Sequence, residues 1–241
     1  KKRISKSVFE NKEQFQIAFE SVATELVCAS VYFELFKQLG RSFEEYNYEV
    51  SQASVFWSIT YDLHLSATII GLCRAYDTHE HSNHLSRVLS AISDAIIDND
   101  KITFIEPRIL SEIDVDQLAN DIQFVDRKND PVKKLIAWRG NMFVHSNLAI
   151  VTKRKENQRL NPPKIDDFEL LLTRGMEIVN RYGVILYSKG FVTDLIGIDS
   201  YSFVFECIRK GLSVFDLERD QKLKDLGLNP DVFRLGGFGR T

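Results

Sequence analysis

The stretch NKEQFQIAFESVATELVCASVYFELFKQL, residues 11–39, sets the fold class of this chain. Its apolar side chains recur at alternating steps of four and three residues: Phe15, Phe19, Val22, Leu26, Ala29, Phe33 and Phe36. That spacing follows the 3.6-residue period of an amphipathic helix. We therefore predict one long helix, which ends at Gly40 because glycine is typical of helix C-termini.

The rest of the chain continues the helical pattern. Further helices are predicted at about residues 43–76, 85–97, 107–124, 130–147, 166–189, 200–211 and 216–226. The middle of the segment 43–76 is apolar on nearly all sides, which predicts burial between other helices, with Phe56 and Trp57 in the core. Because no internal repeat and no alternating strand pattern is visible, we predict an all-α fold. Two long antiparallel helices form its centre, and extra helices follow at the C-terminus.

Length and composition are those of an ordinary globular protein. The chain has 241 residues, of which 44% are hydrophobic and 27% are charged. These values fit one large soluble domain, or one domain with an appendage. Three scattered cysteines form no CxxC pair, which suits a reducing cytosol. No secretory signal is visible at the start, and Asp62 and His64 interrupt the best apolar run, so we expect a cytoplasmic protein without membrane contact.

The segment WRGNMFVH, Trp138–His145, puts a charge where its helix should be apolar. On a helical wheel, Arg139 is central on a stripe whose members lie within about 60° of it: Val132, Leu135, Ile136, Met142 and Phe143. Arginine is rarely buried without a partner, because an unpaired buried charge is costly. His145 lies about 120° away and about 9 Å along the axis, in the last turn, where the helix dipole favours imidazolium. The two side chains therefore diverge within one chain, and a second helix is needed to complete a site.

Basic side chains concentrate around this segment. Residues 127–164 hold ten Lys or Arg and two acids, a net charge of +8, which leaves −11 for the rest of a chain whose net charge is −3. A basic segment in an acidic protein predicts a local anion-binding site. Its centre is the helix that carries Arg139 and His145.

An Arg followed by four to six residues and a His, on a late helix of a small all-α bundle, is the motif of HEPN domains. RGNMFVH resembles it, with five intervening residues, and LIAWRGNMFVHSN and LCRAYDTHEHSNHLSRVL are similar to the abortive-infection (Abi) branch. The resemblance covers about residues 11–189, so we place a HEPN-like helical domain at 1–190 and a C-terminal helical extension with a flexible tail at 191–241. One position departs from the family: Gly140 stands where a polar residue usually follows the arginine, and Asn141 comes one place later.

The resemblance implies a metal-independent endoribonuclease that acts in phage defence or as a toxin and needs no cofactor. RNA supplies the 2′-hydroxyl nucleophile, so the enzyme has to transfer protons, which suits histidine, and grip phosphate oxygens, which suits the planar guanidinium. HEPN proteins commonly form homodimers with one shared cleft, and an antitoxin or a nucleotidyltransferase is a further expected partner. The candidate catalytic residues are Arg139, His145 and Asn141, and the candidate RNA-binding residues are Lys134, Lys153, Arg154 and Lys155.

Each candidate also has a structural interpretation. Arg139 is then one half of an ion pair with an acid on a neighbouring helix, either Asp62 or Asp77. His145 then only caps carbonyl groups at the end of its helix, and Asn141 is neutral. Asp77 alternatively holds the loop that follows it, by capping the backbone from residue 78 onward.

Two other clusters are predicted to be solvated. The loop HEHSNH holds three close histidines, but it has no cysteine and no obvious fourth ligand, so we predict a solvated loop rather than a zinc site for His79, His81 and His84. The acids of the segment 107–124 do not match the spacing of a calcium loop. A solvated helix face is therefore predicted for Asp114, Asp116 and Asp121.

Three functions stay open from the sequence. The first is RNA cleavage, which requires that metal-free cleavage is lost in Arg139→Ala or His145→Ala. The second is a non-catalytic HEPN module that binds RNA, a nucleotide or a protein, which Gly140 favours and which salt-sensitive RNA binding without cleavage would support. The third is a helical interaction domain, in which truncation near Gly190 abolishes function while the motif variants stay active.

Overall fold

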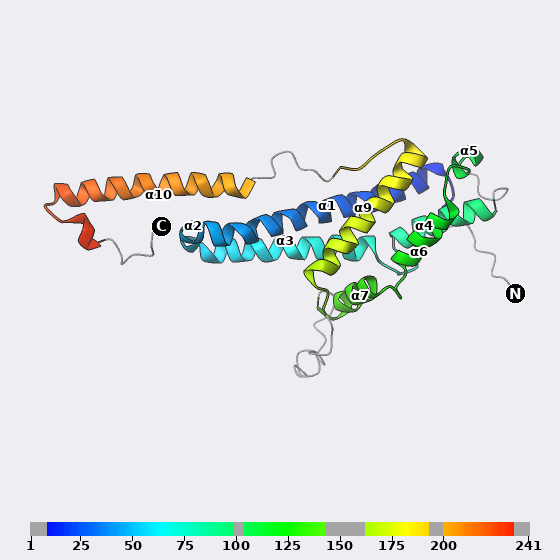
Figure 1. Ribbon diagram of the computed structural model, residues 1–241, viewed down its shortest axis with the longest axis horizontal. Coiled ribbons are helices and arrows are strands. Elements are labelled where there is room, and N and C mark those ends of the chain that lie inside the picture. The colour runs from blue at the N-terminus through cyan, green and yellow to red at the C-terminus, as the bar shows by residue number, and fades with distance from the viewer. Residues whose placement is uncertain (1–8, 99–103, 143–161, 193–199, 234–241) are drawn as a thin grey trace. The chain divides into compact units, whose positions relative to one another are not determined.

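The computed structural model describes residues 9–98, 104–142, 162–192 and 200–233, and gives only the backbone of residues 140–142. Every regular element in these ranges is helical, which confirms the predicted all-α fold (Figure 1). The elements are α1 (Lys12–Glu45), α2 (Asn47–Ser51), α3 (Ser54–Ala75), α4 (Leu85–Ile97), α5 (Pro107–Leu110), α6 (Val115–Val125), α7 (Asp130–Met142), α9 (Ile165–Tyr187), α10 (Ser200–Asp225) and the 3₁₀ helix η2 (Pro230–Phe233).

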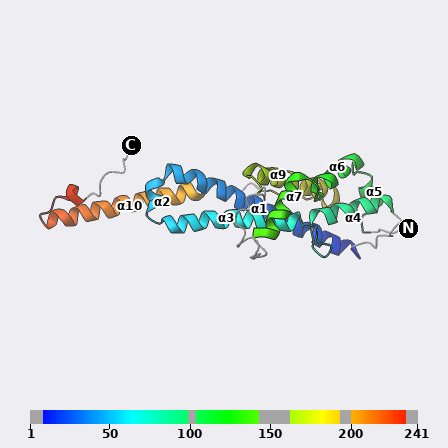
Figure 2. The same ribbon diagram turned by 90° about the horizontal axis from the view of Figure 1, so that it is seen from below.

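The chain divides into two compact units. One takes Lys1–Tyr32 and Ser66–Thr193, and the other takes Phe33–Leu65 and Asp194–Thr241. The long helices α1 and α3 each contribute residues to both units. Within each unit, a segment of α1 runs antiparallel to a segment of α3 (Figures 1 and 2). The domain boundary that we placed at residue 190 stays a prediction.

The first unit is held by close helix contacts. A Cβ atom built on Gly71 of α3 would lie 2.9 Å from the Cβ of Ala29, and one built on Gly175 of α9 would lie 2.8 Å from Cδ2 of Leu26. Both glycines therefore let a neighbouring helix approach α1 more closely than a larger residue would allow. The stripe predicted on α1 is buried in this unit, at Phe15, Phe19, Val22, Leu26 and Ala29.

The second unit has a small aromatic core. Phe205 of α10 is fully buried, and the centre of its ring lies 4.6 Å from that of Trp57 and 5.1 Å from that of Tyr46. An ion pair of 2.6 Å between Arg209 Nε and Glu49 Oε1 ties α10 to α2. Aromatic burial and this ion pair together fix the N-terminal half of α10 in the unit.

The helix boundaries differ from the prediction in three places. Helix α1 continues through Gly40 to Glu45, and a Cβ atom on Gly40 would lie 3.3 Å from the Tyr61 ring, so this glycine provides space inside a helix instead of ending it. The single helix predicted at 43–76 is α2 followed by α3. The two helices predicted at 200–211 and 216–226 are one helix, α10, in which Gly211 has open space around it.

The predicted burial of α3 is partly wrong. Trp57 is buried as expected, but Phe56 has an exposed fraction of 59%. At about 100° per residue, Trp57 lies on the opposite side of the helix from Val55 and Ile59, which are also exposed. One side of α3 therefore faces a core and the other faces solvent.

The remaining predicted helices agree more closely. Helix α4 has the predicted bounds, the segment 107–124 forms α5 and α6, and α9 lies within two residues of the predicted 166–189. Helix α7 begins at Asp130 as predicted, while its predicted end at residue 147 and the tail 234–241 lie outside the described residues. Among the helices that the structure describes, none has the length and apolarity needed to cross a lipid bilayer.

Candidate functional site

Helix α7 carries Arg139 in its last turn. The helix packs on α9 through Val132 and Leu135, which are completely buried, and the ring of Trp138 lies 6.3 Å from that of Phe168. The side chain of Arg139 keeps 30% of its surface exposed. Packing on α9 thus fixes the backbone of the motif, while the guanidinium stays accessible to solvent.

Arg139 forms an ion pair with Asp77. Its Nη1 atom lies 2.9 Å from Oδ1 of Asp77, which follows α3 directly after Tyr76. Of the two acids that the sequence offered as structural partners, the observed one is Asp77, while Asp62 is exposed. The pair explains why a guanidinium is tolerated beside the apolar face of α7, since its charge is compensated.

Asp77 also organises the chain that follows it. Its Oδ1 atom accepts hydrogen bonds from the backbone N–H groups of Thr78 (2.7 Å) and His79 (3.2 Å), and its Oδ2 atom accepts one from the hydroxyl of Ser82 (2.9 Å). Burial acts to raise the pKa of this carboxyl, but the donors from Ser82, Thr78 and Arg139 outweigh it and hold the pKa below its ordinary value of 3.8. Both structural roles considered for Asp77, ion pairing and loop capping, are present.

The lowered pKa of Asp77 predicts how the stability of the fold depends on pH. The folded-state pKa is below the unfolded value, so the carboxylate stabilises the fold at neutral pH and this contribution is lost as the pH falls through the folded-state pKa, below about 4. We expect Asp77→Asn to be less stable than the wild type at pH about 7, and the difference to shrink in acid. Urea unfolding of both proteins over a pH series measures this, and a difference that does not change with pH would contradict it.

The loop from residue 78 to residue 84 is tied down at several points. The N–H of Ser82 donates to the carbonyl of His79 (3.0 Å), and the Arg87 guanidinium donates to the carbonyls of Glu80 and Ser82. The side-chain amide of Asn83 donates to the carbonyl of Ala18 (2.8 Å). These bonds give the loop a defined course beside the ion pair of Arg139 and Asp77.

The three histidines of this loop have different environments. His84 is buried, its Nδ1 accepts the N–H of Arg87 (3.1 Å) and caps α4, and burial lowers its pKa. His79 and His81 are exposed. The predicted solvated loop is therefore correct for two histidines and wrong for His84, because helix capping places its side chain inside. Within the described residues, no three His, Cys, Asp or Glu side chains gather as metal ligands.

The other predicted site residues are placed less completely. Lys134 lies on α7, and its Nζ atom is 2.6 Å from Oδ2 of Asp130 and 3.5 Å from Oδ1 of Asp167, so two acids already compensate its charge. The backbone of Asn141 belongs to α7, but its side chain is not described. The predicted residues outside the described ranges are His145, Lys153, Arg154 and Lys155.

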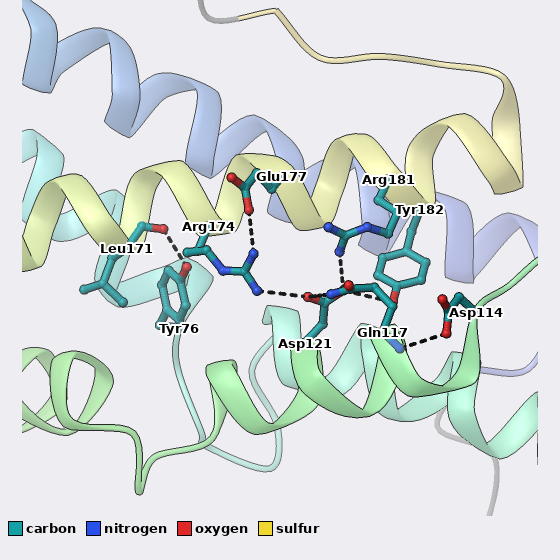
Figure 3. A network of polar contacts seen from close by, with 9 residues as sticks. All are labelled: Tyr76, Asp114, Gln117, Asp121, Leu171, Arg174, Glu177, Arg181 and Tyr182. Carbon is teal, nitrogen blue, oxygen red and sulfur yellow. Dashed lines mark hydrogen bonds and ion pairs between the residues drawn. The ribbon is translucent and has the colours of Figure 1, made fainter.

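A second polar centre of this unit lies at Asp121 of α6, which is completely buried (Figure 3). Its Oδ1 atom accepts from Gln117 (3.0 Å) and Arg174 (3.4 Å), and its Oδ2 atom accepts from the hydroxyl of Tyr182 (3.0 Å) and from Arg181. The solvated face predicted for the acids of α6 is therefore wrong at Asp121, because α9 covers it with two arginines and a tyrosine. Burial and the neighbouring carboxylate raise the pKa of Tyr182.

A sequence signal for this centre does exist. Arg174 and Arg181 are seven residues apart and therefore lie on one side of α9, two turns from each other. Two cations on one helix side predict an acidic partner on the helix that covers them. The sequence alone does not identify this acid, because Asp114, Asp116 and Asp121 are all candidates for it.

Comparison with known proteins assigns the chain to a family. Residues 12–202 of the 241-residue chain match the family model HEPN_AbiU2, described as AbiU2. No curated protein and no solved structure matches the chain. The match runs from the start of α1 past the end of α9, so it includes both residues of the ion pair of Asp77 and Arg139, and it confirms the resemblance to the abortive-infection branch. The chain therefore belongs to the AbiU2 family of HEPN domains, which are abortive-infection proteins of phage defence.

Proposed function

We propose that this protein is a metal-independent endoribonuclease in which Arg139 and His145 act on an RNA phosphate. The observation that carries the proposal is the environment of Arg139. Its guanidinium is anchored 2.9 Å from Asp77, yet 30% of the side chain is open to solvent. A guanidinium has five N–H donors, so one carboxylate contact orients the group without using all of them.

The reaction needs three contributions. The 2′-hydroxyl oxygen of RNA attacks the adjacent phosphorus, and His145 takes its proton as general base. Arg139 donates to the non-bridging phosphate oxygens, on which negative charge increases in the transition state. The bond from phosphorus to the 5′-oxygen then breaks, and the protonated imidazole of His145 gives its proton to that oxygen. The products are a 2′,3′-cyclic phosphate and a free 5′-hydroxyl, and the nucleophile comes from the substrate itself.

We also propose that two copies of the chain form the cleft. The helix predicted from the sequence to run to residue 147 would put Arg139 and His145 about 120° apart, and a single motif helix would then present them in different directions. A second copy that faces the first supplies the missing group. Asn141 is proposed to help orient the phosphate, and Lys134, Lys153, Arg154 and Lys155 to bind the flanking RNA, with Lys134 released from its two acids by the RNA. An antitoxin or a nucleotidyltransferase is proposed as the partner that restrains the activity.

The proposal predicts that His145→Ala abolishes cleavage. Loss of a general base lowers a rate by about 10²–10⁴-fold. The assay uses purified protein, labelled single-stranded RNA and excess EDTA, and identifies a 2′,3′-cyclic phosphate end on the product. The matched control is His81→Ala, which removes an exposed imidazole. Cleavage that requires magnesium, or that persists in His145→Ala, would show that the reaction is of another kind.

The second candidate function is a non-catalytic module that binds RNA. The observation that favours it is the pairing of the basic groups, since Arg139 contacts Asp77 and Lys134 contacts Asp130 and Asp167. In that case the ion pair of Arg139 serves the fold alone. RNA binding that weakens with salt, together with intact RNA after long incubation, distinguishes this module from the nuclease.

A further inference from the structure

The carboxylate of Asp77 contacts both Arg139 and the backbone of His79, and so brings these two residues close together. Its Oδ1 atom lies 2.9 Å from Nη1 of Arg139 and 3.2 Å from the backbone nitrogen of His79. Because both distances start at the same atom, the two nitrogens are at most the sum of these distances, 6.1 Å, apart. One strand of a nucleic-acid duplex carries a phosphate about every 3.4 Å along the axis, so a separation of up to 6.1 Å covers neighbouring phosphates. His79 is thus within reach of a strand that Arg139 holds.

Among the histidines that the structure describes, His79 is the exposed one whose backbone N–H donates to Asp77. His64 belongs to the second unit, where its Nε2 contacts the hydroxyl of Tyr201. His84 is buried and caps α4. His81 is exposed, but its Nε2 lies 3.4 Å from Oε1 of Glu80. His79 is exposed, and its backbone N–H donates a hydrogen bond to the Asp77 carboxylate.

The hydrogen bonds of the loop select a donor role for His79. Its Nδ1 accepts the backbone N–H of His81 at 3.3 Å, so in the neutral ring the proton is on Nε2. An Nε2–H group is a donor, which fits a phosphate oxygen. The same bond occupies the nitrogen that would otherwise take a proton from the 2′-hydroxyl, so the geometry favours binding over general-base catalysis by this residue.

The charge of Asp77 does not prevent an RNA phosphate from approaching. The carboxylate has four donors around it, from Thr78, His79, Ser82 and Arg139, and its side chain is 15% exposed. A carboxylate saturated in this way has its charge offset by N–H and O–H dipoles and by the guanidinium. The exposed residues that follow it in the loop are Thr78, His79 and Glu80, and Arg139 is partly exposed.

We propose that His79 is a second RNA contact of this site, whose Nε2–H donates to the phosphate backbone beside the phosphate that Arg139 binds. This inference rests on the proposed function, in which Arg139 binds an RNA phosphate. Asp77 is then the residue that positions both contacts, one through its ion pair and the other through the backbone of the loop.

The test measures binding apart from cleavage. Fully 2′-O-methylated RNA has no nucleophile, and fluorescence anisotropy at fixed salt and at pH about 8, above the ordinary pKa of histidine, gives Kd for the full chain. A hydrogen bond to a charged group contributes enough that its loss weakens binding by about tenfold, which is the expected result for His79→Ala. His79→Gln keeps a side-chain N–H donor and is expected to stay within about threefold of the wild type. His81→Ala, from the same exposed loop, is expected to bind like the wild type.

Two results would overturn the role of His79. One is an unchanged Kd in His79→Ala, and the other is a Kd as weak in His79→Gln as in His79→Ala, which points to the loop and not to the donor. Thermal unfolding of each variant checks that the fold is intact. Arg139→Ala separates the two hypotheses, because unchanged binding in that variant contradicts the proposed RNA site itself. Weaker binding in Arg139→Ala with normal binding in His79→Ala rejects only the contribution of His79.

Discussion

Replacing Asp121 with alanine is expected to lower the free energy of unfolding by about 3–5 kcal/mol. The carboxylate is completely buried, and two arginines, a tyrosine hydroxyl and a glutamine amide donate to it (Figure 3). Its removal takes the buried acid away from both guanidinium groups and leaves Arg174 paired with Glu177. The melting temperature of a chain of this size is expected to fall by roughly 10 °C, which calorimetry or circular dichroism measures.

Two further variants show whether this loss of stability is specific to Asp121 and how much of it comes from its charge. Asp116→Ala removes an exposed acid from the same helix and is expected to change the stability by less than about 0.5 kcal/mol. Asp121→Asn keeps the shape and one acceptor, so an intermediate loss is expected, which separates the contribution of charge from that of hydrogen bonding. Equal stability of Asp121→Ala and Asp116→Ala would mean that the centre does not hold α6 and α9 together.

The second large effect is expected on RNA cleavage. Arg139→Ala should reduce the rate by about 10²–10³-fold, the typical consequence of removing one group that stabilises transition-state charge. Arg139→Lys keeps a positive charge but loses the planar fork, so its activity should be intermediate or low. The ion pair with Asp77 is close to one-third exposed on the arginine side, so solvent screening limits its contribution to the fold to about 1 kcal/mol or less. Activity and stability are therefore expected to respond very differently.

Arg127→Ala is the control for this experiment. Arg127 is an exposed cation in the same basic segment, and its loss removes the same charge without touching the motif. We expect it to reduce cleavage only slightly, with an effect that disappears at higher salt. If Arg139→Ala and Arg127→Ala reduce cleavage equally, Arg139 contributes only general attraction for RNA and the catalytic role proposed for it is wrong.

Local sequence pattern accounts for most of the helices. The stripe on α1 and the periodic patterns of the segments that form α4 and α9 each depend on nearby residues, and the structure confirms these helices. Glycine was less informative, because Gly40 and Gly211 both lie inside helices. A glycine permits a helix to end but does not force it to end. At Gly40 the helix continues, and the nearby ring of Tyr61 favours a small residue there.

The candidate site was predictable in part for the same reason. The segment from Arg139 to His145 is contiguous, so the sequence alone is enough to propose it as the site, and it lies within the residues that the family model matches. The state of Lys134 was not predictable, because one of its two acids, Asp167, comes from another helix. Similarly, the burial of His84 follows from its role as the cap of α4 and not from the polarity of its loop.

The helical class of the chain and the places of its main helices follow from the sequence alone, because hydrophobic periodicity depends on residues that are near one another along the chain. Packing between helices, by contrast, sets which acid pairs with Arg139, Asp77 and not Asp62, and which acid of α6 is buried, Asp121 and not Asp116. These choices depend on partners that are distant in sequence: Asp121 meets arginines 53 and 60 residues away. Asp114 caps α6 through local bonds and Asp116 is exposed, whereas Asp121 is buried because α9 places Arg174 and Arg181 on it.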